Sequence, residues 1–580
     1  MLYKILKNRS LFAIRLIATL LLGIASTSSA FAEEPLEKST TTPTAWTRHY
    51  GVTAATITAQ VNAGYRIIDI EVVNATTPTF NVVTVANSGE NTSAWWWYYG
   101  ITSSQLSSYL ASNNARLIDI ESYFVNGTRY FAVVMIQNSG TRASSWWYYY
   151  GQTFADLSAK LKANNARLID VDTYEVNGVR YYDSIMIQNT GTNSAAWWWY
   201  TDIPVSDIGK YANTNDARLI DIERQSNGKY TVVMIKNSGS QWWWLYGVTA
   251  DNVNSFLSQY GTRIIDIESY LINGEYRYDV IYLNNVNAQT SRVRDLIANK
   301  RTGGTFGLYV KEVNASTKVA LMSSTPFEPA STIKAVHHIH GMKRVYDKQD
   351  SLSDLVQGFS DYVKNGDGTD SSCPQDTSPV WIPRSNAHNL MMVNSDNRWT
   401  QAFRVEYTET ALNNTAIDLG MSSTKLNHRI GCGGTPNQLT LVDAGKLYQA
   451  VRNGYIGYGS ERNSFYNLMI MGQNDITPVI NEEAANLGLD NTQINDFKSR
   501  VRAAAKAGNY DLNNALYVSI AGWVSFPAKT PTGVIVGKEY VHGMFIDKAS
   551  SISPEFLIWN MRGESLREQI RDALTTYKLY

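Results

Sequence analysis

The chain has 580 residues, too many for one hydrophobic core, and therefore divides into at least two domains. Hydrophobic residues make up 44% and charged residues 18%, a composition typical of folded globular proteins. Lys plus Arg and Asp plus Glu both number 51, and no dense basic patch occurs, which argues against a nucleic-acid partner.

Residues 1–32 have the pattern of a secretory signal peptide. Basic residues precede a mostly apolar run from Leu16 to Ile24, and small residues follow up to Ala32, where we expect cleavage. Residues 33–45 then form a linker. A retained membrane anchor is the alternative, but a run of about nine residues is too short to span about 30 Å of hydrocarbon. We expect a secreted protein, extracellular or periplasmic, without a stable membrane span.

Residues 46–290 contain five tandem repeats of about 50 residues. The motif Arg-aliphatic-Ile-Asp-aliphatic recurs in each, and runs of Trp recur between the motifs. The motifs begin at Arg66, Arg116, Arg167, Arg218 and Arg263, and the Trp runs lie at 95–97, 146–147, 197–199 and 242–244. We interpret the repeated Arg and Asp as buried polar partners between neighbouring repeats and assign no metal to them.

Each repeat is predicted to hold one short helix, a β-hairpin and an aromatic strand. In the second repeat, Thr102 and Gln105 have the spacing of a capping box, and Asn126-Gly127 supplies the positive φ angles of a tight hairpin turn. Such a unit cannot bury its own apolar surface, so the repeats form an α+β array, closed or propeller-like. The Trp runs are expected to pack inside it; the alternative is a stacking platform for sugar rings or an extended peptide.

Residues 291–580 are predicted to form a second domain, and it carries the motif S-x-x-K at Ser331 and Lys334. A helix that continues to Val345 would place both residues on one face. A desolvated Lys amine could then take the proton of the Ser hydroxyl. Backbone N–H groups at a helix start would also stabilise developing negative charge. The motif alone is weak, because it occurs by chance in many proteins.

Two further elements follow in order: Ser395-Asp396-Asn397, and a strand-like segment that contains Ile520-Ala521-Gly522. With these elements, residues 300–580 resemble the penicillin-recognising serine hydrolases, closest to class A β-lactamases. The resemblance implies an α/β serine β-lactamase-like, or D,D-peptidase/transpeptidase-like, fold that ends in a helix over Ser565 to Tyr577.

The resemblance also implies a role for each matched residue. Ser331 would be the acylated nucleophile, Lys334 a proton acceptor and Ser395 a proton relay to the leaving group. Asn397 would bind substrate backbone. The oxyanion hole would combine the backbone N–H of Ser331 with that of Trp523, the residue after Gly522.

The chain departs from the family pattern in two places. Ile520 stands where the family has the Lys of Lys-Thr-Gly, so the cation that grips a substrate carboxylate is missing from this alignment. His542, on the neighbouring strand, is a candidate group for the cleft, with a structural histidine as the alternative. No Glu or Asp occurs from Leu419 to Val442, where class A β-lactamases place the deacylating glutamate.

Two cysteines and a histidine cluster complete the candidates. Cys373 and Cys432 are the chain's two cysteines, and in an exported protein they are expected to form a disulfide. His337, His338 and His340 have no acidic or Cys partner close in sequence, so we expect helix packing there rather than a metal site. No cofactor is predicted.

The joint architecture resembles the secreted polyglycine hydrolases, serine endopeptidases that cut glycine-rich linkers, over residues 46–580. The missing carboxylate-binding Lys fits an internal peptide bond, which has no free carboxylate beside it. The alternatives are a β-lactamase or peptidoglycan D,D-peptidase, and a non-catalytic binding protein with a degenerate hydrolase domain. The expected partner is a peptide or cell-wall substrate.

Overall fold

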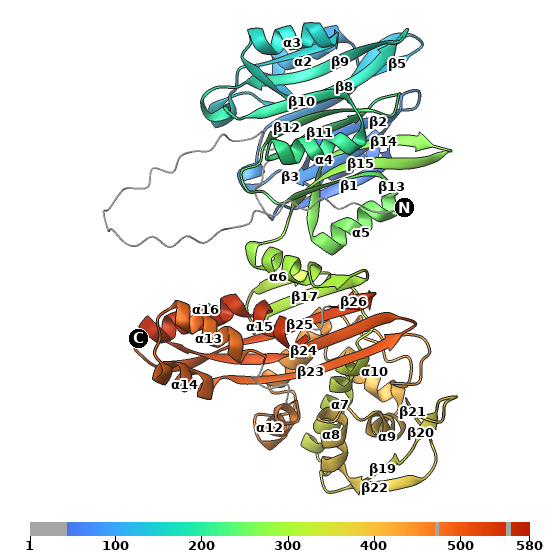
Figure 1. The fold of residues 1–580 in the computed structure, drawn as a ribbon, viewed down its shortest axis with the longest axis vertical. Coiled ribbons are helices and arrows are strands. Elements are labelled where there is room, and N and C mark those ends of the chain that lie inside the picture. Colours follow the sequence, from blue (N-terminus) through green and yellow to red (C-terminus); the bar gives the residue numbers. More distant parts are fainter. Residues whose placement is uncertain (1–42, 470–474, 553–557, 580) are drawn as a thin grey trace. The chain divides into compact units, whose positions relative to one another are not determined.

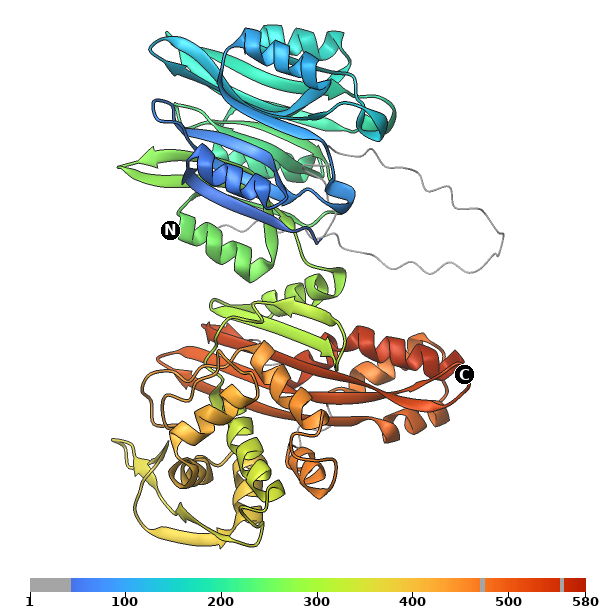
Figure 2. The same ribbon diagram turned by 180° about the vertical axis from the view of Figure 1, so that it is seen from behind.

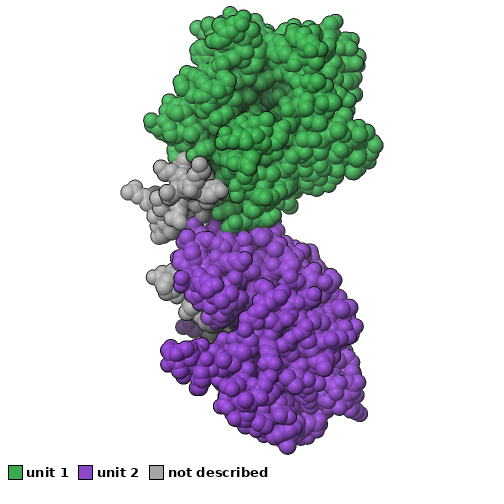
Figure 3. Space-filling model, turned by 90° about the vertical axis from the view of Figure 1, so that its right-hand side faces the viewer, with its two compact units in different colours: residues 1–286 green, residues 287–580 purple. Residues whose placement is uncertain are grey.

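A computed structural model describes residues 43–469, 475–552 and 558–579 (Figure 1). The chain forms two compact units, residues 1–286 and 287–580, which are described separately (Figure 3). The predicted signal peptide lies outside the described residues. Within the described ranges, no helix is both long enough and apolar enough to span a membrane.

Unit 1 consists of five repeats, each with one helix and a three-stranded antiparallel sheet. In every sheet the third strand of the repeat lies in the middle, as in the order β1-β3-β2. The elements are β1 (Trp46–Val52), α1 (Ala54–Asn62), β2 (Tyr65–Asn74), β3 (Thr79–Ala86); β4 (Trp95–Ile101), α2 (Ser103–Asn113), β5 (Ala115–Val125), β6 (Thr128–Gln137); β7 (Trp146–Gln152), α3 (Phe154–Ala163), β8 (Ala166–Val176), β9 (Val179–Gln188); β10 (Trp197–Ile203), α4 (Val205–Thr214), β11 (Ala217–Arg224), β12 (Tyr230–Lys236); and β13 (Trp242–Val248), α5 (Ala250–Tyr260), β14 (Thr262–Ile272), β15 (Glu275–Asn284).

The elements predicted from local sequence signals are present in the structure. Thr102 caps α2 in a capping box with Gln105, and the turn between β5 and β6 has positive φ angles at Asn126 (50°) and Gly127 (78°). The predicted helix-plus-hairpin repeat is therefore confirmed.

One edge strand of each sheet contacts the corresponding strand of the next repeat, and we call these the inner strands. They are β2, β5, β8, β11 and β14, and β14 also contacts β2, so the contacts run through all five repeats. The sheets stay separate and do not merge into one barrel. The repeated Asp residues link neighbours: Ile70 N–H donates to Asp119 Oδ2 (3.1 Å), and Ile120 N–H to Asp170 Oδ2 (3.1 Å). These hydrogen bonds confirm that the repeated acids are polar partners between repeats.

The Trp runs occupy the strands at the opposite edge of each sheet, such as β4 and β10, and most of their side chains are half-buried. Trp243 is an exception, because only 8% of it is exposed. The Trp runs therefore pack against the cores of the array, as predicted, but most of their side chains stay partly exposed. The reason is that aliphatic residues of the inner and middle strands already fill the interior.

Unit 2 contains a five-stranded antiparallel sheet in the order β18-β17-β25-β24-β23. It begins with α6 (Ala288–Ala298), capped by Asn287, a few residues before the boundary expected from sequence. The other elements are β16 (Arg301–Thr302), β17 (Thr305–Glu312), β18 (Thr317–Leu321), the 3₁₀ helix η5 (Ala330–Ile333), α7 (Lys334–Tyr346), β19 (Leu355–Phe359), β20 (Tyr362–Lys364), β21 (Asp370–Pro374), β22 (Pro379–Pro383), α8 (Arg384–Met392), α9 (Asn397–Tyr407), α10 (Glu409–Asp418), α11 (Leu441–Arg452), α12 (Ser460–Asn467), α13 (Thr477–Asn486), α14 (Asn491–Arg500), β23 (Arg502–Leu512), β24 (Ala515–Lys529), β25 (Ile535–Ala549), β26 (Ser551–Ile552), α15 (Ile558–Ser565) and α16 (Arg567–Leu579).

The sheet of unit 2 separates two hydrophobic cores. Helices α6 and α13–α16 pack on one face, with Val310 and Ile520 in their core. Helices α7–α12 pack on the other face, with Tyr309 and Ala521 in theirs (Figures 1 and 2). Alternate residues of one strand thus enter different cores, as expected for a sheet covered on both faces. The predicted α/β domain with a final helix is confirmed.

Candidate active site

The nucleophile candidate lies in a tight turn between the sheet and α7. Ala330 has a φ of 46°, and Ser331 sits in η5, which leads directly into α7 at Lys334. Glu328 Oε1 accepts a hydrogen bond from the Ala330 backbone N–H (3.3 Å) and so helps to hold the turn. Ser331 therefore lies one turn before Lys334, as the motif spacing predicts.

Lys334 is fully buried and lies among polar groups of the Ser395-Asp396-Asn397 segment. Its Nζ donates to Asn397 Oδ1 (2.7 Å) and to the carbonyl of Ser395, and lies 3.2 Å from Ser395 Oγ. Burial, followed by the charge of Lys506, lowers the pKa of Lys334 well below its usual value, against an opposing contribution from Asp396. A neutral amine in this position can accept a proton.

Ser395 bridges two lysines. Its φ of 56° turns it toward the site, and its Oγ lies 3.1 Å from Lys506 Nζ as well as 3.2 Å from Lys334 Nζ. Lys506 is 5% exposed, also donates to the Ala507 carbonyl (2.6 Å), and has its pKa lowered to about 8 by burial. A hydroxyl between two amines of lowered pKa can pass a proton from one to the other.

Lys506, Ala507 and Gly508 lie on β23, the edge strand of the sheet. A Cβ added at Gly508 would lie 2.3 Å from the Ser331 backbone N, so only glycine allows this strand to approach the nucleophile so closely. The Ala505 N–H donates away from the sheet to Met469 O (3.3 Å). Because alternate residues of a strand point the same way, the Asn509 N–H also faces the free edge. The N–H groups of Ser331 and Asn509 can form an oxyanion hole.

Asn397 lies where two loops meet. Its Nδ2 donates to the carbonyl of Ser372 (2.9 Å), while its Oδ1 accepts from Lys334. The disulfide predicted from the sequence joins the neighbouring residues Cys373 and Cys432, whose Cα atoms are 4.4 Å apart. The substrate-binding candidate therefore lies directly beside the disulfide.

Family models match segments of both units. Residues 288–555 match the model of the beta-lactamase enzyme family. The second unit is a β-lactamase-like serine hydrolase domain. Residues 143–189 match a polyglycine hydrolase-like structural repeat. The search of curated proteins found no significant match.

Several solved structures are similar to the chain, and they cover about half of it. A β-lactamase from Sphaerobacter thermophilus has 17% identity over 50% of this chain and 96% of that chain, with a TM-score of 0.35. PBP-A has 19% identity over 51% and 97%, with a TM-score of 0.36. A β-lactamase from Chitinophaga pinensis has 13% identity over 51% and 100%, also with a TM-score of 0.36.

The third motif of the β-lactamase-like domain is not where the sequence alignment put it. Gly522 lies on β24, one strand in from the edge, where an added Cβ would be 2.3 Å from the Ala504 carbonyl. Trp523 is 8% exposed and donates its Nε1–H to Glu539 Oε2 (3.0 Å). Neither residue lies on β23, the strand whose Gly508 lies against the Ser331 backbone N. This position does not fit the oxyanion assignment to Trp523, and the Asn509 N–H is the candidate in its place.

His542 also lies away from the cleft. It is 2% exposed on β25, and its neighbours at alternate positions, Tyr540 and Met544, belong to the core beneath α13–α16. Burial and then the charge of Arg562 lower its pKa well below the usual value. It is a structural histidine on the opposite face of the sheet from α7.

Lys506 is the residue that sequence reasoning missed. The sequence alignment has Ile520 at the position of the family's Lys, so the carboxylate-binding cation is missing from it. Lys506-Ala507-Gly508 differs from Lys-Thr-Gly by one residue, and it lies on β23, the first of the three long strands that precede the final helices. Counting strands back from the C-terminus would have found it.

The histidine cluster of α7 packs inside the β-lactamase-like domain. His338 Nδ1 lies 3.1 Å from His388 Nδ1, and the ring of His338 stacks on Phe465. His340 Nδ1 lies 2.7 Å from Thr415 Oγ1. The ring contacts support the predicted packing role.

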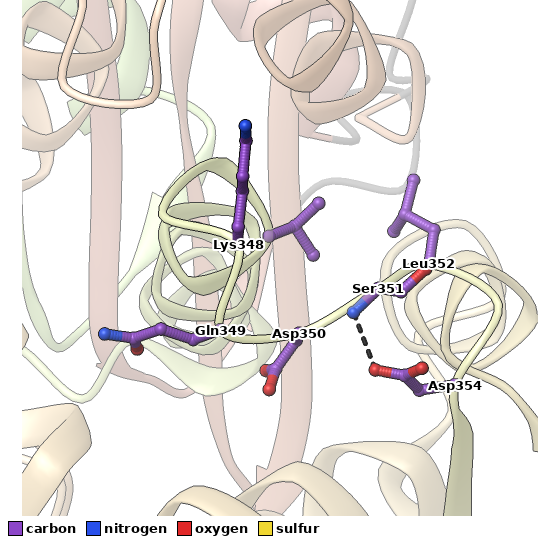
Figure 4. Close-up of a pocket in the computed structure, with 7 residues that line it drawn as sticks. Lys348, Gln349, Asp350, Ser351, Leu352 and Asp354 are labelled. Carbon is purple, nitrogen blue, oxygen red and sulfur yellow. Dashed lines mark hydrogen bonds between the residues drawn. The ribbon is translucent and has the colours of Figure 1, made fainter.

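A cavity of about 570 Å³ lies beyond the C-terminal end of α7, at the other end of the helix from Lys334. Figure 4 shows its lining, in which the Ser351 N–H donates to Asp354 Oδ2 (2.6 Å). Asp350 at its edge is paired with Arg344 (2.8 Å). The carboxylates of Asp350 and Asp354 are thus engaged in local interactions.

Proposed function

We propose that the chain is a secreted endopeptidase that cleaves glycine-rich peptides through an acyl-enzyme on Ser331. The observation that carries the chemistry is the buried Lys334 amine, held between Ser395 and Asn397 one turn after the nucleophile.

In the acylation step, neutral Lys334 takes the proton of Ser331 Oγ as that oxygen attacks the scissile carbonyl carbon. The oxyanion is stabilised by the backbone N–H groups of Ser331 and Asn509. As the C–N bond breaks, Ser395 Oγ gives its proton to the leaving nitrogen and regains one from Lys334. The products are a free amine and an ester of Ser331.

In the deacylation step, a water molecule attacks the ester carbon and restores Ser331 Oγ–H. The segment 419–442 has no Asp or Glu to activate this water. Lys334, already neutral again, lies one helical turn from Ser331 and can serve as base in both steps. We therefore expect slower deacylation than in enzymes with a dedicated glutamate.

The substrate class rests on the repeats and on the joint architecture. The third repeat matches the model described as polyglycine hydrolase-like, and it is followed in the same chain by a β-lactamase-like domain. Export fits the signal-peptide pattern of residues 1–32 and the Cys373–Cys432 disulfide.

One observation favours a second candidate, a β-lactamase or D,D-peptidase. Lys506 supplies the cation whose apparent absence from the sequence argued for an internal peptide bond. A carboxylate-bearing substrate could pair with it. Support for glycine-rich peptides then comes mainly from the match of the third repeat.

The two candidates are separated by measuring kcat/KM for a glycine-rich peptide and for a penicillin on one preparation, with Ser331→Ala as background. We expect peptide cleavage, together with a slowly hydrolysed penicillin adduct. Fast penicillin turnover without peptide cleavage would contradict the peptidase proposal and retain the nucleophile.

A further inference from the structure

We infer that four residues, Ser372, Cys373, Gly431 and Cys432, form a disulfide-bridged wall that sets the substrate specificity of the cleft. The wall admits glycine and rejects larger side chains at the substrate residue that acylates Ser331. The inference rests on the proposed acyl-enzyme function and names the feature that would select its substrate.

The two halves of the wall touch each other and Asn397. Ser372 Oγ donates to the Gly431 carbonyl (3.0 Å), and the Ser372 carbonyl accepts from Asn397 Nδ2 (2.9 Å). A Cβ added at Gly431 would lie 2.1 Å from the Ser372 carbonyl oxygen and 2.6 Å from Asn397 Nδ2. Gly431 is therefore packed directly against Ser372 and Asn397, with no room for a side chain of its own.

The wall is fixed at several points, so that it cannot easily move aside for a large substrate. The disulfide joins segments 59 residues apart, next to both touching residues. The hairpin that carries Ser372 is also held by Tyr362, whose hydroxyl donates to Asp396 Oδ1 (2.9 Å). Asp396 in turn caps α9 through the Arg398 N–H (2.8 Å).

The position of the wall restricts the acyl part of a substrate. An acyl group on Ser331 lies between the free edge of β23 and the Ser395–Asn397 segment, because the attacking oxygen and the oxyanion hole are there. Asn397 Nδ2 carries two hydrogens; one is donated to Ser372, and the other remains for a substrate carbonyl. The acylating residue lies between the scissile carbonyl and that carbonyl, beside the bridge, where a glycine has no Cβ to collide with it.

The test uses two activated esters, the p-nitrophenyl esters of N-acetylglycine and N-acetyl-L-phenylalanine, whose hydrolysis does not require peptidase activity. Wild-type protein should prefer the glycine ester. In Cys373→Ser/Cys432→Ser, the glycine-to-phenylalanine ratio of kcat/KM should fall about tenfold or more, a size typical of steric selection in a pocket. Ser331→Ala gives the background rate.

Two measurements keep the test decisive. Circular dichroism and labelling of Ser331 by a small fluorophosphonate check that the double variant is folded; if it is not, wild-type protein reduced with a phosphine is measured instead. A wild-type protein without glycine preference, or a ratio unchanged within twofold when the bridge is removed, would overturn the inference.

The outcomes also separate this inference from the proposed function. If removal of the bridge lowers the glycine-to-phenylalanine ester ratio but no glycine-rich peptide is cleaved, the specificity inference is supported and the peptidase proposal is contradicted. If glycine-rich peptides are cleaved and the ester ratio is unchanged, only the specificity inference is contradicted.

Discussion

At the residue scale, the chemistry depends on the charges of two buried lysines that share Ser395. Lys334 lies deeper, and its pKa is lowered well below the usual value by burial and by Lys506. Lys506 keeps its proton over more of the pH range because its pKa is lowered only to about 8. One amine is thus suited to accept a proton and the other to carry positive charge.

The pKa of Lys506 predicts an alkaline limit for carboxylate-bearing substrates. Above pH 8 Lys506 becomes neutral and loses its attraction for a carboxylate, so acylation by a penicillin should slow there. Lys506→Arg should move this limit to higher pH, because a guanidinium stays charged. The measurement is the acylation rate from pH 6 to 10, with the uncharged N-acetylglycine ester as control. Identical profiles for penicillin and ester would contradict this role.

At the element scale, the site depends on the edge strand β23 lying close against η5. Gly508 allows this approach, and the alternation of the strand turns the Asn509 N–H toward the same edge. The nucleophile therefore comes from η5 and the Asn509 N–H from β23, two elements far apart in sequence.

Gly508→Ala tests this packing. Its Cβ would meet the Ser331 backbone N at 2.3 Å, so strand and turn must separate, and kcat/KM should fall at least about a hundredfold, the cost of losing an oxyanion-hole donor. Gly366→Ala is the matched control, because an added Cβ there has no atom within 4 Å. Hydrolysis of the glycine ester by both variants is the measurement. Wild-type activity in Gly508→Ala would show that the approach is not needed.

The sequence predicted those elements whose signals are local. Ser331, Lys334 and Ser395 lie in short contiguous motifs, and their placement follows from helix geometry and motif order. Gly522 and His542 were assigned to the cleft but lie away from it. The strand that borders the cleft and the face on which each residue lies depend on the order of strands in the sheet, and a local sequence pattern does not indicate that order.

Tertiary packing decided the features that could not be predicted. The contact between Ser372 and Asn397 joins two loops, and no spacing in the sequence indicates it. The partial exposure of the Trp runs could not be predicted, because a half-buried outer strand and a core strand have the same apolar pattern. The disulfide was predictable, since the chain has only two cysteines.

At the scale of a whole unit, the repeat array concentrates acidic groups along its inner strands. Glu121, Glu223 and Glu268 bring their carboxylate oxygens within 4.8 Å of one another. Burial, followed by interactions that include neighbouring carboxylates, raises the pKa of each well above its usual value. Burial likewise raises the pKa of Glu71 and of Asp172 to about 7. Protons can keep these groups neutral in the folded array.

This arrangement predicts that the array loses stability as pH rises. The unfolded carboxyl groups release their protons near pH 4, whereas the folded ones hold them up to about pH 7. Between these values the folded state binds more protons, so its free energy of unfolding falls with increasing pH. The melting transition of unit 1, followed in the full chain, should therefore lie at a lower temperature at pH 8 than at pH 5.

Asp172→Asn should reduce this difference by several degrees, because it removes one titrating group and leaves an uncharged side chain in the interior. Glu275→Gln is the matched control, since the Glu275 side chain is 71% exposed and pairs with Arg277. Calorimetry at both pH values measures the effect. A melting temperature that rises from pH 5 to pH 8 would contradict the prediction.

The central claim is that Ser331, activated by Lys334, forms the acyl-enzyme, and intact-protein mass spectrometry after brief exposure to N-acetylglycine p-nitrophenyl ester tests it most directly. We predict one added acetylglycyl group, mapped to the peptide that contains Ser331. This adduct should be absent in Ser331→Ala and nearly absent in Lys334→Ala. Ester turnover in the double variant should be little lower than in either single variant, because the effects of residues that act as one unit are not additive. An adduct on another residue, or undiminished ester turnover in Ser331→Ala, would contradict the account.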